Sequence, residues 1–107
     1  MTHRYPLVDI KDVSPADPRP GIGADVRLAI GDHNGSPTAA VHWTTEPGGS
    51  LTPHINRGCE EILYYLDGSG TDGQDSVQAG HCRLVPKGTS HAFIANTGDE
   101  RTSAVSF

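Results

Sequence analysis

Four polar residues of this chain have types and spacing that could do chemistry together: His54, Asn56, Glu61 and His91. His54 and Asn56 are separated by one residue, so on an extended strand their side chains project from the same face. Imidazole, amide and carboxylate groups can hold a divalent metal ion, and a carboxylate beside an imidazole in an apolar pocket can transfer protons. The sequence therefore predicts a site for metal or acid–base chemistry.

These residues fall within two patterns of fixed spacing, which also contain glycines and a proline. The first is Gly48-x5-His54-x-Asn56-x4-Glu61-x6-Gly68, and the second is Gly80-x5-Pro86-x-Gly88-x2-His91-x4-Asn96. Glycine permits positive φ or close backbone approach at turns, and a proline can end a strand without leaving a missing donor in a central ladder. Together the two patterns resemble the paired motifs of the cupin superfamily, small β-barrels that usually hold one metal ion between the motifs.

The resemblance implies a ligand set and a cofactor. His54, Glu61 and His91 would be metal ligands, and Asn56 would stand at the fourth position, where family members typically have histidine. The implied cofactor is one divalent ion, Fe, Mn, Ni or Zn. Because an amide oxygen is a weaker ligand than imidazole, a site without metal is the alternative. The six-residue gap to Gly68 favours Glu61 over Glu60 as the carboxylate ligand.

Short strands must position these residues, because no stretch of 10 to 12 residues keeps a helical apolar period. The chain contains 13 glycines and 8 prolines, and turn signals separate the apolar runs, which is typical of an all-β sandwich or barrel. With the resemblance, this predicts a single-domain double-stranded β-helix, the jelly-roll or cupin barrel. The expected strands include Val26–Ile30, Thr38–Thr45, Ile62–Leu66 and Ala104–Phe107, with others at Val85 and Phe93–Ile94.

The chain divides into a Pro-rich arm over residues 1–24 and the barrel over residues 25–107. Within the arm, Tyr5–Ile10 is the one candidate strand; the arm either drapes over the barrel or pairs with a partner subunit's sheet. Only 35% of residues are hydrophobic, which is lean for one core. The lean core and the arm together predict a homodimer.

The alternation of side chains along a strand predicts further residues of the pocket. Tyr65 is in phase with Glu61 and is expected to line the cavity, whereas Tyr64 is expected in a sheet or subunit contact. Either His42 or Trp43 should face the cavity. If His42 does so, it is a candidate acid/base group.

Charge and composition exclude several function classes. The net charge is −5 and the eight basic residues are scattered, which argues against nucleic-acid or anionic-membrane partners. Since there is no long apolar run and no signal-peptide core, we expect a cytoplasmic protein. Cys59 and Cys82 match no CxxC pattern; we interpret them as buried thiols, with a facing pair as the alternative.

The function favoured by these observations is a metal-dependent enzyme of the cupin type. It would act on a small organic metabolite in the barrel cavity, in a dioxygenase-like or a lyase, cyclase or isomerase reaction. Bacterial biosynthesis is a setting suggested by family analogy alone. Two alternatives stay open: a metal-free acid–base dehydratase or isomerase, and a non-catalytic module that binds a sugar or similar small ligand.

Overall fold

The computed structural model describes residues 6–15, 21–55, 58–98 and 100–107, although for His54 and Ile55 it describes only the backbone. This part of the chain is built of strands with almost no helix, which confirms the all-β class. The strands are β1 (Gly21–Ile30), β2 (Ala40–Ile55), β3 (Glu61–Asp67), β4 (Ser69–Asp72), β5 (Asp75–Gln78), β6 (Cys82–Val85), β7 (Ser90–Ala95) and β8 (Thr102–Ser106). Two 3-10 turns, η1 (Ile10–Asp12) and η2 (Asp32–Asn34), accompany them.

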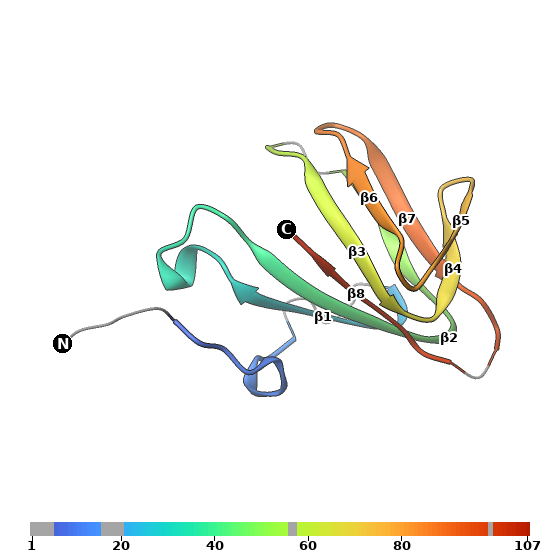
Figure 1. Cartoon of the computed structure of the whole chain (residues 1–107), viewed down its shortest axis with the longest axis horizontal. Helices are drawn as coiled ribbons and strands as arrows, with labels where there is room; N and C mark the ends of the chain where they lie inside the picture. Colours follow the sequence, from blue (N-terminus) through green and yellow to red (C-terminus); the bar gives the residue numbers. More distant parts are fainter. Residues whose placement is uncertain (1–5, 16–20, 56–57, 99) are drawn as a thin grey trace.

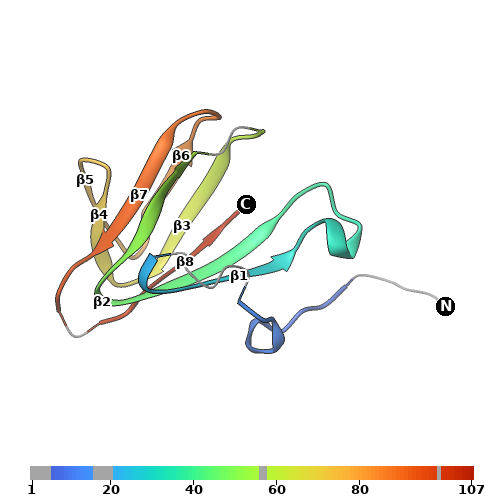
Figure 2. The same ribbon diagram turned by 180° about the vertical axis from the view of Figure 1, so that it is seen from behind.

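The strands form one antiparallel sheet that curls into a barrel (Figures 1 and 2). Their order across the sheet is β5-β4-β7-β2-β8-β3-β6, with β1 paired to β2. Neighbours in this order are often far apart along the chain, so β8 lies between β2 and β3. The barrel expected from the two motifs is therefore present.

Strand β2 takes part in both walls of the barrel, because it bends in its middle. Its first half, residues 41–45, pairs with β8 and β1, and its second half, residues 50–55, pairs with β7. Gly49 lies at the bend, where a Cβ atom would come within 2.6 Å of the Ile22 carbonyl oxygen and 2.9 Å of the Glu46 carbonyl oxygen. Only a residue without a side chain fits there.

The core consists of inward-facing side chains from both walls. The rings of Trp43, Tyr65 and Phe93 pack together with centroid distances between 5.1 and 5.8 Å. Along β3, Leu63 and Tyr65 are buried while the residues between them are exposed, as period-2 alternation requires. This alternation separates an inner face, which holds the candidate site, from an outer face.

The N-terminal arm differs from the expectation in one respect. The strand expected over Tyr5–Ile10 is not formed in residues 6–10, which hold only the start of η1; residues 1–5 lie outside the described part. The Arg27 side chain on β1 donates hydrogen bonds to the carbonyl oxygens of Ile10 and Val13, at 3.3 and 2.9 Å. These bonds fix the turn against the barrel, and Figure 1 shows the residues before it leaving the body of the molecule.

Both cysteines are free and exposed, so the expectation of buried thiols is wrong. Cys82 begins the edge strand β6, and its side chain points outward because the neighbouring inward position belongs to Arg83. The described residues contain no helix of the length and apolarity needed to cross a membrane.

Candidate functional site

The candidate site begins with two side chains that lie on different walls of the barrel. Glu61 is the first residue of β3, and His91 is the second residue of β7. Each is in phase with buried residues of its own strand: Leu63 follows Glu61 at period 2, and Phe93 follows His91. Curling of the sheet therefore turns both polar groups toward the interior.

Glu61 and His91 are in direct contact. The distance from Glu61 Oε1 to His91 Nε2 is 3.0 Å, and the two side chains are only 15% and 9% exposed. The hydrogen bond to Glu61 raises the pKa of His91, against the opposing effect of burial. The carboxylate therefore favours the protonated form of the imidazole, in a place from which water is mostly excluded.

The neighbouring Glu60 is exposed and lies before β3. Of the two adjacent carboxylates, the structure thus brings Glu61, and not Glu60, to His91. This is the residue that the motif spacing favours.

The other two expected ligands are described only in part. The backbone of His54 lies opposite His91 in the β2–β7 register, so the two residues are cross-strand neighbours. The His54 side chain and the whole of Asn56 lie outside the described residues. In the part that is described, no group of three or more His, Cys, Asp or Glu side chains is arranged to hold a metal ion. The expectation of a four-residue metal site stays a prediction.

His42 does not line the interior. The buried Trp43 and Thr45 take the inward positions of β2, and His42 lies on the opposite face, beside Arg27 of β1 and Val105 of β8. The candidate acid/base role for His42 is therefore withdrawn, because strand alternation gives the inward position to the tryptophan.

Tyr65 faces inward as expected, but its hydroxyl group is engaged. It is fully buried, and its hydroxyl donates a hydrogen bond to Asp72 Oδ2 at 2.8 Å. Burial and this hydrogen bond raise the pKa of Tyr65, so the phenol stays protonated. Tyr65 thus acts in the structure as a donor to Asp72 within the core.

Asp72 and Arg83 form a second polar group that motif reasoning missed. Asp72 is 1% exposed, and its Oδ1 lies 3.8 Å from Arg83 Nη1. Arg83 Nη2 also contacts Asp75 Oδ2, and this contact is the main reason that the pKa of Arg83 is raised. The alternation of side chains along β6 could have predicted the position of Arg83. Arg83 is two residues from the inward-facing Val85, so both side chains lie on the same face of the strand.

The contacts of Arg83 join two edges of the sheet. β6 is the last strand at one end of the strand order, and β5 is the last at the other end. Arg83 extends from β6 to Asp72 of β4 and Asp75 of β5. Side-chain ion pairs thus help to close the barrel along this seam.

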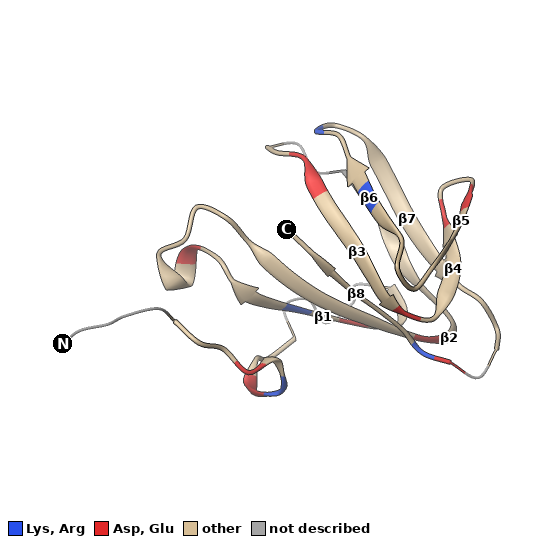
Figure 3. Cartoon of the chain, in the orientation of Figure 1, with Lys and Arg blue, Asp and Glu red and all other residues tan. Residues whose placement is uncertain are grey.

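Figure 3 shows the acidic and basic residues of the described chain scattered over strand ends and turns and, on β1 and β6, within strands. The local electrostatics of the interior therefore come from two short-range groupings, Glu61 with His91 and Asp72 with Arg83.

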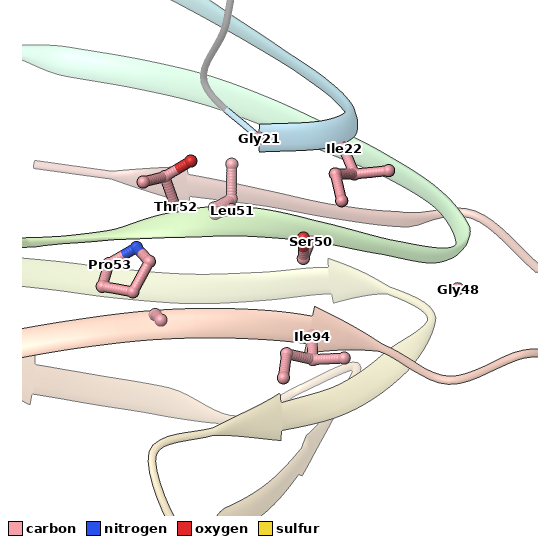
Figure 4. Close-up of a pocket in the computed structure, with 9 residues that line it drawn as sticks. Gly21, Ile22, Gly48, Ser50, Leu51, Thr52, Pro53 and Ile94 are labelled. Carbon is pink, nitrogen blue, oxygen red and sulfur yellow. The ribbon is translucent and has the colours of Figure 1, made fainter.

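A groove of about 530 Å³ lies on the outside of the barrel (Figure 4). Ile22 and Ile94 line it and are largely exposed, whereas Phe93, next along β7, is buried on the inner face. None of the residues that line the groove is titratable: they are Gly21, Ile22, Gly48, Ser50, Leu51, Thr52, Pro53, Ala92 and Ile94. The groove is therefore separate from the Glu61–His91 contact and offers no acid–base or charged metal-ligating groups.

Comparisons with known proteins agree with this architecture. The family model described as a cupin domain matches residues 41–107. Comparison with curated proteins found no match. Among solved structures, the polyketide cyclase RemF from Streptomyces resistomycificus has a TM-score of 0.77 at 23% identity, covering 99% of this chain and 78% of that one. A predicted oxalate decarboxylase from Thermotoga maritima has a TM-score of 0.70 at 26% identity, covering 94% and 95%.

A third solved structure, oxalate oxidase in complex with the substrate analogue glycolate, has a TM-score of 0.69 at 20% identity and covers 85% of this chain and 51% of that one. The family match covers more than half of the chain, so the chain belongs to the cupin family. The resemblance inferred from the two motifs is thereby confirmed.

Proposed function

We propose that this cupin is a metal-dependent enzyme that carries out a lyase, cyclase or isomerase reaction on a small organic molecule in the barrel interior. The observation that carries the proposal is the 3.0 Å contact between Glu61 and His91, which lie on different walls of the barrel and are mostly buried. Similar folds include a polyketide cyclase and a predicted oxalate decarboxylase, so small-molecule chemistry of this kind occurs on this scaffold.

The donor atoms that are present suit a divalent transition-metal ion. A carboxylate oxygen and an imidazole nitrogen are ligands for Fe, Mn, Ni and Zn, with bonds of roughly 2.0–2.2 Å. Two such atoms 3.0 Å apart are close enough to bind one ion. We assign Glu61 and His91 as ligands, with His54 as the third because it is the cross-strand neighbour of His91. Asn56 would be the fourth group, as an amide ligand or as a hydrogen-bonding partner of substrate or water.

A bound ion would supply Lewis-acid polarisation of a substrate oxygen. Because Glu61 and His91 would then be ligands of the ion, the described residues around them would supply a wall that limits water. Phe93, which follows His91 at period 2 on β7, is buried and packs against Trp43, so aromatic side chains limit the approach of bulk water from the core. Electrostatic interactions are stronger in such a place than at the protein surface.

One observation favours a second candidate, a metal-free acid–base dehydratase or isomerase. The Glu61–His91 contact has hydrogen-bond length, so a proton can occupy the place that a metal ion would take. An imidazole and a carboxylate that share a proton are the groups that general acid–base catalysis uses.

The test is the metal content of tag-free protein purified without chelator, followed by separate additions of Fe²⁺, Mn²⁺, Ni²⁺ and Zn²⁺. We expect about one ion per chain in the unaltered protein. Glu61→Gln should lower the affinity for the ion at least about tenfold, and Glu60→Gln, which changes the exposed neighbour, should leave it unchanged. Equal losses in both variants would refute the assigned carboxylate.

Two results would overturn parts of the proposal. Protein that stays free of metal after all four additions would refute the metal-dependent function and favour the acid–base candidate. Oxygen uptake coupled to substrate turnover would replace the lyase, cyclase or isomerase assignment by a dioxygenase. Asn56→His should tighten metal binding if residue 56 faces the ion, since imidazole is the stronger ligand.

A further inference from the structure

Strand pairing joins the two walls of the barrel on one side only. The order β8-β3-β6 forms the wall with Glu61, the order β2-β7-β4-β5 forms the wall with His91, and pairing of β2 with β8 joins them. On the opposite side, at the edge strands β5 and β6, no strand pairing crosses between the walls in the described part of the chain. The separation of the walls on this side is therefore set by side chains.

Two side chains of the Glu61 wall cross this gap and meet at Asp72 of β4. The Tyr65 hydroxyl on β3 donates a hydrogen bond to Asp72 Oδ2 at 2.8 Å, and Arg83 Nη1 on β6 lies 3.8 Å from Asp72 Oδ1. Tyr65 and Asp72 are 0% and 1% exposed, so bulk water does not compete for their hydrogen bond. We call Tyr65, Asp72 and Arg83 the seam clamp.

The strand register places the seam clamp one layer below the candidate site. Arg83 is opposite the second residue after Glu61, and Asp72 is opposite the second residue after His91. Two residues of a strand span roughly 7 Å, so each of these clamp residues lies about one layer from its counterpart in the site. Both pairs cross the same gap between the walls, and a change in the gap at one layer is expected at the other.

The width of this gap matters for binding a metal ion. Two ligand atoms that are each roughly 2.0–2.2 Å from one ion, at an angle of about 90–110°, lie roughly 2.8–3.6 Å apart. The observed separation of Glu61 Oε1 and His91 Nε2, 3.0 Å, is within this range. A widening of about 1 Å would exceed it, and sites with errors of this size bind poorly.

We propose that Tyr65, Asp72 and Arg83 are positioning residues that hold the two walls at the separation at which Glu61 and His91 can bind one ion. The inference rests on the proposed metal-dependent function. Apolar packing between the walls is not directional, so it opposes separation but allows small shifts. Hydrogen bonds and ion pairs depend on distance and angle, and the seam clamp supplies them next to the site.

Titration of the metal-stripped full chain with Co²⁺, followed by visible absorption, tests the proposal, because the absorption bands report the coordination geometry as well as the affinity. Asp72→Asn and Arg83→Gln should each weaken Co²⁺ binding about tenfold and shift the bands. Glu46→Gln is the matched control, since it breaks an exposed ion pair with Arg101, and it should change neither. A role in stability alone would lower Tm and leave the affinity and the bands of the folded protein unchanged, which would overturn the proposal.

The sign of the effect at Arg83 separates positioning from simple electrostatics. Removal of a negative charge weakens binding of a nearby cation, and removal of a positive charge strengthens it. The seam clamp predicts weaker binding in both variants, so tighter binding in Arg83→Gln would overturn it. Arg83→Lys keeps a positive charge facing Asp72 and should bind Co²⁺ at least about threefold more tightly than Arg83→Gln; equal or weaker binding would count against the clamp.

A measurement without metal distinguishes failure of the clamp from failure of the proposed function. In the presence of EDTA, urea unfolding of Glu61→Gln, His91→Gln and the double variant gives the coupling energy of the pair. Asp72→Asn should reduce this coupling by more than half. If the unaltered protein binds no Co²⁺, the metal-dependent function is refuted and this cycle decides the clamp. A coupling that is unchanged by Asp72→Asn, or absent with and without it, would overturn the positioning role.

A further variant keeps the test valid if a single substitution prevents folding. Should Asp72→Asn or Arg83→Gln lose the β-sheet circular dichroism spectrum, the combined variant takes its place, because it leaves no buried charge unpaired. The same tenfold loss of Co²⁺ affinity and the same loss of coupling are expected from it, and unchanged values would overturn the proposal.

Discussion

Replacing Tyr65 by phenylalanine removes one hydroxyl group from the barrel core and leaves the aromatic packing in place. That hydroxyl donates to Asp72 Oδ2 at 2.8 Å, and Asp72 is almost completely buried. The other oxygen, Oδ1, accepts no hydrogen bond from the described residues and faces Arg83 Nη1 at 3.8 Å. The Tyr65→Phe substitution therefore leaves a buried carboxyl group to which no described residue donates a hydrogen bond.

The expected loss of stability follows from this geometry. A hydrogen bond to a charged group contributes about 1.5–3 kcal/mol, and a buried acceptor that loses its donor adds part of its desolvation penalty. Removal of the hydroxyl oxygen leaves little space, so a cavity contributes little. We expect the free energy of unfolding to fall by about 2–3 kcal/mol. For a domain of about 100 residues this corresponds to a decrease in Tm of roughly 10–20 °C.

Urea unfolding at pH 7 measures this loss, and a double-mutant cycle of Tyr65→Phe with Asp72→Ala isolates the pair. The coupling energy should be about 1.5 kcal/mol or more. Tyr64→Phe is the matched control, because Tyr64 is exposed on the outer face, and it should change stability by less than about 0.5 kcal/mol. A Tyr65→Phe loss as small as the control, or additive losses in the cycle, would refute the reasoning.

Two further predictions concern the site and the packing beside it. The hydrogen bond to Glu61 raises the pKa of His91 in metal-free protein, so this pair stabilises the fold fully below about pH 6.5 and less as the pH rises through the raised pKa. The difference in unfolding free energy between the unaltered protein and His91→Gln, measured between pH 5.5 and 8.5, should shrink with rising pH; growth would contradict the sign. Gly70→Ala should destabilise by about 2–4 kcal/mol, because its Cβ would collide with the Ile94 carbonyl oxygen. The same change at Gly98, which has open space, should cost less than about 1 kcal/mol in thermal unfolding, and equal effects would count against the clash.

Local patterns predicted an all-β chain and the orientation of β3, and the resemblance to the cupin family predicted the barrel. The motif spacing favours Glu61 over Glu60, and the structure places Glu61 beside His91. The reason is that a strand has only two faces, so one buried residue such as Leu63 fixes the orientation of the others. The glycines at turns could be predicted for a similar reason, because these positions need a backbone conformation or a close approach that a side chain would prevent. Gly68, for example, has a φ of 79° and lies against Thr102.

The features that the sequence did not predict depend on closure of the barrel. His42 and Trp43 are adjacent on one strand, and nothing local decides which faces inward; in the structure the tryptophan packs against Tyr65 and Phe93. Asp72 is followed by Gly73, and such a pair is typical of a turn. Its burial depends on Tyr65 and on β6, which lie elsewhere in the sequence.

The exposed cysteines follow the same logic. A thiol's burial is set by the face on which its strand presents it, and at β6 the inward position goes to Arg83. The composition of a 107-residue chain gives no information on which residues of a strand face inward.

The place of β8 between β2 and β3 has a consequence for the order of folding events. Val41 of β2 pairs with Ser106, and Leu63 of β3 pairs with the same residue, so both ladders join positions that are distant along the chain. Before β8 inserts, β3 with β6 and β2 with β7 and β4 are separate hydrogen-bonded groups.

Glu61 belongs to the first group and His91 to the second. Among the described strands, backbone pairing joins these two groups through β8, so we expect the Glu61–His91 contact to become fixed only after β8 has inserted. Pairings of such large sequence separation are slow to form, on the scale of milliseconds to seconds. We therefore expect the candidate site to assemble late, and an ion or ligand that needs both residues to act after the earlier pairing steps.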